Sequence, residues 1–142
     1  MTDRSLSDFA AKIREIDICM LSTHTEGGAI AGRPMSNNQQ VDYDGDSYYF
    51  TMDDTRTVED IKKDPKVALS FQGAKAFLIA IEGQAELIRD KGEFAKHWSP
   101  DIDTWFEDGI DTKGLVMIKV HAERAHYWDG EEDGEITLKS RH

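Results

Sequence analysis

The stretch Tyr48–Phe71, "YYFTMDDTRTVEDIKKDPKVALSF", decides the fold because it contains a strand, a turn, a short helix and a second strand in direct succession. The aromatic run Tyr48–Phe50 is typical of a strand. In "TVEDIKKDP", Asp60 follows a threonine by three residues, lysines come late, and Pro65 stands just beyond, which predicts a short helix with a complemented dipole. "KVALSF" alternates as a strand does. Arg56 therefore falls at the start of a helix between two strands.

Upstream of this stretch, the sequence predicts a helix and a hairpin. "SLSDFAAKIREI" has the capping-box spacing of Ser5 and Asp8, followed by apolar residues at helical intervals, so we expect a helix within about residues 1–17. Two apolar stretches then flank the turn signal Thr25–Gly28, which predicts a hairpin. Its second strand contains Pro34, which cannot donate to a sheet ladder and favours an edge strand or a bulge.

Downstream, the patterns predict more strands. Asp44-Gly45 marks a turn before the aromatic strand, and "AFLIAIEGQAELI" is a strand with a bulge at Gly83. "KGEFAKHW" is a short helix, "SPDIDTWFEDGIDTKG" a loop, "LVMIKVHAERAHYW" a long strand or bent strand pair, and 130–142 a polar tail. Six to seven strands with hairpin-length turns favour a mainly β (α+β) antiparallel barrel with flanking helices, in a single domain over 1–142.

The composition limits the kinds of partner. Acidic residues outnumber basic ones 28 to 17, which argues against nucleic acid and anionic membranes as partners. The single cysteine, Cys19, excludes an intramolecular disulfide and lies in the apolar segment "ICML", where we expect it to be buried. Without a signal-like or membrane-spanning stretch, the expected location is the cytoplasm. Any anionic ligand would need local cations, and Arg33 and Arg56 are the candidates.

The segment "TMDDTRTVED" allows two interpretations. The free amides of a helix start, the hydroxyls of Thr55 and Thr57, and the guanidinium of Arg56 together could bind a phosphate. Alternatively, a threonine caps the helix and Arg56 pairs with an acid nearby. The acids within reach are Asp53, Asp54 and Glu59.

Two further segments are also ambiguous. "GRPMS" could present a cation and free backbone groups to a flat heteroaromatic ring, or could be an edge strand that resists aggregation. In "HWSPDIDTWF", the aromatic residues Trp98, Trp105 and Phe106 could close over a ligand or a partner subunit, or could cap the core.

Several catalytic sites have no counterpart in the sequence. The histidines lack metal-ligand spacing, so no metal site is expected, and no Walker loop, dinucleotide fingerprint or nucleophile elbow is present. No side chain is nominated as a chemical catalyst, so a cofactor would have to carry any redox step.

Taken in order, "GRPMS", "YYFT", "TRTVEDIKKDPKVALSF", "IEGQAEL", "HWSPDIDTWFEDG", "LVMIKV" and "AHYWD" resemble the FMN-binding split-barrel superfamily related to pyridoxamine 5'-phosphate oxidase. Within it the chain is similar to the general stress protein 26-like family, from about Ile18 to Asp129. The resemblance implies a split-barrel homodimer with FMN at the interface. It also implies a flavin-dependent oxidoreductase with a stress-related role, transferring hydride at flavin N5, with NAD(P)H or a small molecule as its substrate.

The resemblance also assigns cofactor-binding residues. It places one strand along the flavin, the end of the next strand near it, a loop at the phosphate, and late aromatic residues near the flavin or the dimer contact. These residues are, in that order, Arg33, Pro34, Met35 and Ser36; Phe50 and Thr51; Thr55, Arg56 and Thr57; and Trp98, Trp105 and Phe106.

The chain departs from its relatives at two places. Thr57 stands where relatives commonly have a lysine, so Arg56 becomes the main phosphate cation and FMN affinity or flavin preference is altered, with FAD as the alternative. Leu78 stands where the vitamin B6 oxidase has a glutamine, and "LKSRH" lacks its final Arg-Leu-x-Pro segment, which argues against that activity.

The alternatives to an FMN-dependent oxidoreductase are a nonenzymatic flavin-binding or flavin-sensing stress protein, or a barrel holding FAD, deazaflavin or haem.

Overall fold

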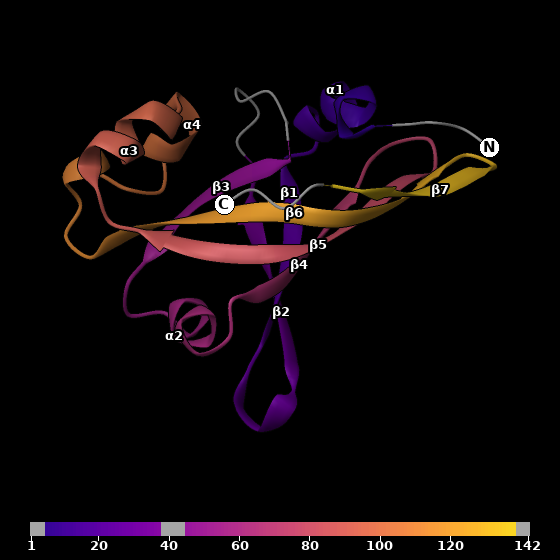
Figure 1. Cartoon of the computed structure of the whole chain (residues 1–142). Helices are drawn as coiled ribbons and strands as arrows, with labels where there is room; N and C mark the ends of the chain where they lie inside the picture. Colours follow the sequence, from indigo (N-terminus) through magenta and orange to yellow (C-terminus); the bar gives the residue numbers. More distant parts are fainter. Residues whose placement is uncertain (1–4, 38–44, 139–142) are drawn as a thin grey trace.

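A computed structural model describes residues 5–37 and 45–138. The described residues form seven strands, four α-helices and three short 3-10 helices (Figure 1). The strands are β1 (Ile18–His24), β2 (Ile30–Ser36), β3 (Asp46–Met52), β4 (Lys66–Gln72), β5 (Phe77–Ile88), β6 (Leu115–Asp129) and β7 (Glu132–Thr137). The helices are η1 (Leu6–Phe9), α1 (Ala10–Arg14), η2 (Glu26–Gly28), α2 (Arg56–Lys63), α3 (Lys91–His97), α4 (Pro100–Asp103) and η3 (Gly109–Asp111).

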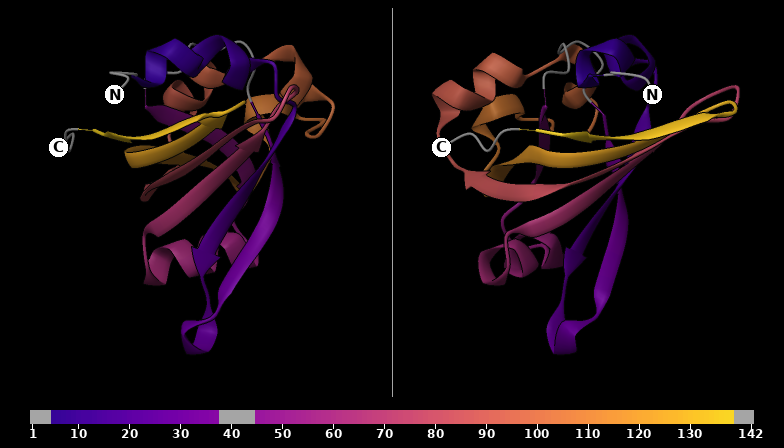
Figure 2. Two further views of the ribbon diagram at one scale, coloured as in Figure 1. Left: turned by 90° about the vertical axis from the view of Figure 1, so that its right-hand side faces the viewer. Right: turned by 45° about the vertical axis from the view of Figure 1, so that its right-hand side comes forward.

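The strands form one antiparallel sheet in the order β2-β1-β4-β5-β6-β3, with β7 also paired to β6. The partners β3 and β7 bind successive parts of β6, residues 115–121 and 124–129. Figure 2 shows the sheet strongly twisted, with α2 at one end and α1, α3 and α4 at the other. The prediction of a mainly β, antiparallel split barrel of six to seven strands is confirmed, and the described residues form seven.

Strict alternation of side chains builds the core. On β4 and β5 every second residue is buried, which places Leu69, Phe71, Ile79 and Ile81 in one apolar cluster. The N-terminal helical segment covers this cluster with Phe9, whose ring is 5.6 Å from that of Phe77. Because the core lies inside the curled sheet, the outer face and the sheet edges remain available for other contacts.

Two predicted backbone features are confirmed. Pro34 lies on β2, at the end of the strand order, where its missing N–H costs no central ladder bond. The pairing of β5 with β6 shifts register between Glu82 and Gly83, so the bulge is present. A Cβ at Gly83 would run into the backbone carbonyl of His121, which explains the glycine.

Three sequence-based expectations need correction. Residues 130–142 are not only a polar tail, because β7 pairs with β6 after a turn at Gly130, whose φ is +66°, and buries Ile136. The loop predicted before β6 contains α4 and η3. The helix after β3 begins at Arg56, with Thr55 at the N-cap position, rather than at a Thr57 cap.

One expectation lies partly outside the described residues, because the Asp44-Gly45 turn includes a residue that the structure does not describe. Every helix within the described ranges is too short or too polar to cross a bilayer.

Candidate functional site

A cavity of about 380 Å³ opens between β2, β3 and the segment after α3, and aromatic and apolar side chains dominate its lining. We call it the aromatic pocket. Seven residues assigned from the sequence line it: Pro34, Met35, Ser36, Phe50, Thr51, Trp105 and Phe106. Other lining residues include Ile18, Tyr48, Met52 and Ile102. Its size and its few polar groups among apolar walls are typical of a pocket for a planar organic ligand.

The late aromatic residues play different parts. Trp105 lines the aromatic pocket while 69% of it is exposed, so its ring is available to a ligand or partner. Trp98 packs in a second apolar cluster, 4.8 Å from the Phe50 ring, and donates from Nε1 to Asp103 at 2.7 Å. Phe106 packs against this second cluster and also lines the aromatic pocket. Trp98 therefore packs as part of an apolar core, whereas Trp105 is placed to close over a ligand or a partner subunit.

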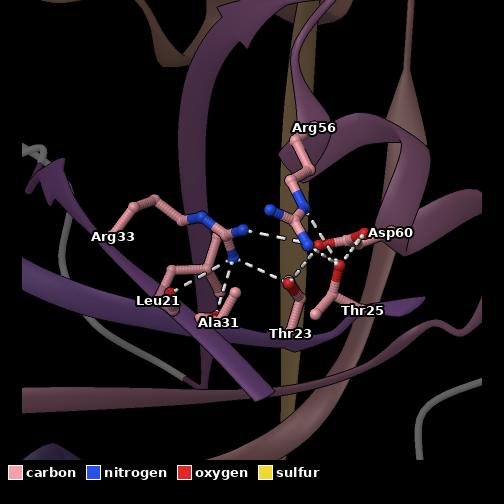
Figure 3. A network of polar contacts seen from close by, with 7 residues as sticks. All are labelled: Leu21, Thr23, Thr25, Ala31, Arg33, Arg56 and Asp60. Atoms are coloured by element: carbon pink, nitrogen blue, oxygen red, sulfur yellow. Dashed lines mark hydrogen bonds and ion pairs between the residues drawn. The ribbon is translucent and has the colours of Figure 1, made fainter. Parts of the chain in front are cut away.

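A polar cluster lies where α2 meets β1 and β2, and we call it the arginine network (Figure 3). It consists of Thr23, Thr25, Arg33, Arg56 and Asp60. Asp60 accepts hydrogen bonds from the hydroxyls of Thr23, at 2.9 Å, and Thr25, at 3.0 Å. Arg33 donates to Thr23 at 2.7 Å and pairs with Asp60 at 3.4 Å, while Arg56 donates to Thr25 from Nε and Nη2 at 3.0 and 2.8 Å.

The two arginines differ in how far the chain already uses them. The Arg33 side chain is only 19% exposed and also donates to the carbonyl of Ala31 at 3.1 Å, so its guanidinium is held inside the protein. Arg56 is exposed, and its partner among the described residues is a neutral hydroxyl. Arg56 is thus the cation that an anionic ligand can reach.

Asp60 is ionised despite its burial. Burial alone would raise its pKa, but hydrogen bonds from Thr23 and Thr25 and the charges of Arg33 and Arg56 outweigh it, so the pKa lies below its ordinary value. A buried carboxylate supported in this way is a fixed negative charge that organises the donors around it.

The structure changes the local interpretation of the α2 start. The Thr55 hydroxyl donates to the Met52 carbonyl at 2.9 Å instead of capping the helix, and Thr57 is buried.

Arg56 forms none of the predicted ion pairs with nearby acids. Asp53 pairs instead with Arg89 at 2.5 Å, and Glu59 pairs with Lys62. Within the described residues Asp54 is no partner of Arg56, which bonds to Thr25.

The aromatic pocket and the arginine network are joined along the chain. The end of β3, Phe50–Met52, lines the pocket, and a short turn then leads to Arg56 at the start of α2. On β2, Arg33 of the network directly precedes Pro34 of the pocket. The first amides of α2 have no partner within the helix, which adds donors at this junction.

Three network residues escaped the sequence analysis: Thr23, Thr25 and Asp60. The spacing of Thr57 and Asp60 predicts only a short helix, yet the Asp60 carboxylate bonds to β1 and to the turn after it. Asp60 follows the buried Thr57 by three residues, and this helical spacing puts the two on the same side of α2. Over the described ranges no group of three potential ligands is placed to hold a metal ion.

Comparisons with known proteins agree with this fold. The chain matches a solved protein related to general stress protein 26, of the pyridoxinephosphate oxidase family, from Clostridium acetobutylicum, with 22% identity, 93% and 96% coverage of the two chains, and a TM-score of 0.80. It also matches a general stress FMN/FAD binding protein from Xanthomonas citri, with 21% identity, 96% coverage of both chains and a TM-score of 0.75. A haem binding protein from Mycobacterium smegmatis matches with 16% identity, 96% coverage of this chain, 60% of the other, and a TM-score of 0.75.

These structural similarities show the fold alone, and the family is shown by comparison of the sequence with family models. A comparison with curated proteins finds no match. The family model described as "Pyridoxamine 5'-phosphate oxidase like" matches residues 4–140, almost the whole chain. The chain therefore belongs to the pyridoxamine 5'-phosphate oxidase-like family.

Proposed function

We propose that this protein binds FMN, with the flavin ring in the aromatic pocket and the phosphate directed toward Arg56. The observation that carries the proposal is the continuity of the two parts of the site. The strand that lines the pocket with Phe50 and Thr51 leads directly into the helix that starts with Arg56. A flat heteroaromatic ring joined to an anionic group by a short chain has the shape and chemistry that this arrangement suits.

The residues present fit such a ligand. Apolar and aromatic side chains form most of the pocket, and Ser36 and Thr51 add hydroxyls able to bond a heteroaromatic ring. Arg56 has five N–H groups, of which two bond to Thr25 within the described chain, and the rest can donate to phosphate oxygens. The amides at the start of α2 favour an anion in the same place.

The charge available for a phosphate is small. Arg33 is engaged by Asp60, and Thr57 offers no cation and is buried. Arg56 is therefore the principal phosphate contact, and we expect FMN affinity to depend strongly on it. FAD is the alternative flavin, because its pyrophosphate needs less positive charge per phosphate.

We extend the proposal to a flavin-dependent oxidoreductase with a stress-related role, using NAD(P)H or a small-molecule substrate. When bound, FMN supplies hydride transfer at N5 of its ring. The chain's own part is to bind and orient the ring, to exclude water with Trp105 and Phe106, and to hold the phosphate end. The competing hypothesis is a flavin-binding protein without turnover, and NADPH or NADH oxidation that an added electron acceptor accelerates would rule that hypothesis out.

We further propose a homodimer that shares the site between subunits. Four apolar side chains on the outer sheet face, Ile18, Met20, Leu78 and Trp128, are between 41% and 50% exposed and line one groove. Contiguous exposed apolar surface of this kind marks interaction sites. Ile18 also lines the aromatic pocket, so a second copy seated on this face would reach the flavin site.

Substitution on this face tests the dimer. Leu78→Glu places a charge in the proposed interface and should shift the protein from dimer to monomer in light scattering. The control, Thr137→Glu, adds the same charge at an exposed position on β7 and should leave a dimer. A Leu78→Glu protein that stays dimeric, or a wild-type monomer that binds FMN tightly, contradicts the shared site.

Binding itself is tested by titration. Flavin fluorescence measured against increasing wild-type protein should show saturable binding of FMN, and weaker binding of riboflavin, which lacks the phosphate. Equal affinity for the two flavins would contradict a role of the arginine network in binding the phosphate. If the protein bound neither flavin, the flavin proposal would be wrong.

A further inference from the structure

Thr25 occupies an unusual place between the two charged groups of the arginine network. It lies just after β1, in the turn that leads to β2, and its hydroxyl oxygen is 3.0 Å from Asp60 Oδ1. The same oxygen is 3.0 Å from Nε and 2.8 Å from Nη2 of Arg56. In Figure 3 dashed lines join the Thr25 hydroxyl both to the Asp60 carboxylate and to the Arg56 guanidinium.

The direction of each hydrogen bond follows from the number of protons. A guanidinium can only donate, and an ionised carboxylate can only accept. The Thr25 hydroxyl has one proton, so it donates that proton to Asp60 and accepts from Arg56 with its lone pairs. Thr23 stands in the same relation to Asp60 and Arg33, at 2.9 and 2.7 Å.

The charges assign different tasks to the two arginines. Arg33 contacts Asp60 directly, at 3.4 Å, and is its counter-ion. Arg56 contacts the carboxylate only through Thr25, so its positive charge is not cancelled by a direct ion pair. Asp60 therefore polarises the hydroxyl that holds Arg56 but does not neutralise the Arg56 guanidinium in a direct ion pair.

We propose that Asp60 and Thr25 form a positioning relay that holds the Arg56 guanidinium ready for the phosphate of a flavin nucleotide. The inference rests on the proposed flavin binding and adds residues to the phosphate end of that site. Arg56 is a long, exposed side chain, and a ligand that meets it already oriented avoids the entropic cost of ordering it. Thr25 and Asp60 are positioning residues, since they act through Arg56.

The test compares FMN with riboflavin in matched variants. Thr25→Val keeps the shape but removes the hydroxyl, and should weaken FMN binding by about two- to tenfold, the range for ordering one long side chain, while riboflavin binding stays unchanged. Thr25→Ser retains the hydroxyl and should restore the wild-type ratio of the two dissociation constants. A merely structural role of Thr25 would weaken both flavins together.

Asp60→Asn provides a second test that leaves Thr25 itself unchanged. Its single amide oxygen cannot accept equally from both threonines, so the preference for FMN over riboflavin should fall here too. The relay is overturned if both Thr25→Val and Asp60→Asn keep the wild-type FMN-to-riboflavin ratio, or if Thr25→Ser behaves like Thr25→Val. If the wild-type protein binds neither flavin, the proposed function fails and the relay with it, an outcome distinct from the previous two.

Discussion

Replacing Arg56 by alanine removes the exposed cation at the phosphate end of the site. Arg56 lies at the start of α2, and its guanidinium is fixed by Thr25 through two donors. The substitution leaves the buried Arg33–Asp60 pair in place. The fold should therefore survive, and the effect should fall on the ligand.

The size of the effect follows from the donors that are lost. The N–H groups of Arg56 not used by Thr25 can form charge-assisted hydrogen bonds to phosphate, each worth about 1.5 to 3 kcal/mol. Because Arg56 is exposed, we take a value near the lower end for the whole interaction, about 2 kcal/mol. That corresponds to an increase of about 30-fold in the dissociation constant of FMN.

Flavin fluorescence titration measures this directly. The control is Lys96→Ala, which removes one exposed positive charge from α3, at the other end of the molecule from α2 (Figure 1). We expect less than a twofold change for the control, and little change in riboflavin affinity for Arg56→Ala. Equal FMN dissociation constants for the two variants would refute the assignment of the phosphate to Arg56.

Three other predictions follow from burial and charge. Asp60→Asn should lower the free energy of unfolding at neutral pH by about 3 kcal/mol, because it leaves Arg33 without its counter-ion. In urea unfolding this loss should shrink as pH falls through the ordinary pKa of a carboxyl toward the lower pKa of folded Asp60; a pH-independent loss would contradict the ion pair. Burial raises the pKa of Cys19 to about 11, so a thiol reagent at pH 8 should react only after unfolding, and rapid labelling of the native protein would disprove its burial. Trp105→Ala should weaken both flavins by about fivefold with little change in melting temperature, whereas Trp98→Ala should cost about 3 kcal/mol of stability; the reverse pattern would exchange their roles.

Local sequence patterns were sufficient for most of the elements. The alternation of β4 and β5, the bulge at Gly83 and the edge position of Pro34 each depend on neighbouring residues and on backbone chemistry. β7 was missed because half of its residues are acidic, and Ile136 is the one residue of this strand that is buried. Its pairing with β6 is a tertiary fact that composition does not reveal.

The site was harder to predict than the fold. The family resemblance named residues that do line one pocket, including Phe50 and Trp105. The sequence could not connect Asp60 with its threonine partners, because they are 35 and 37 residues away in the chain. The same limit applies to Arg33, whose engagement with Asp60 depends on how α2 packs against β1 and β2.

Identification of the ligand that purifies with the protein tests the central claim most directly. An absorption spectrum of the purified protein, recorded before and after adding FMN, and mass measurement of the released ligand distinguish flavin, deazaflavin and haem. The account predicts an oxidised flavin spectrum and the mass of FMN. A haem or deazaflavin spectrum, or a protein that purifies without flavin and gains none on adding FMN, would contradict it.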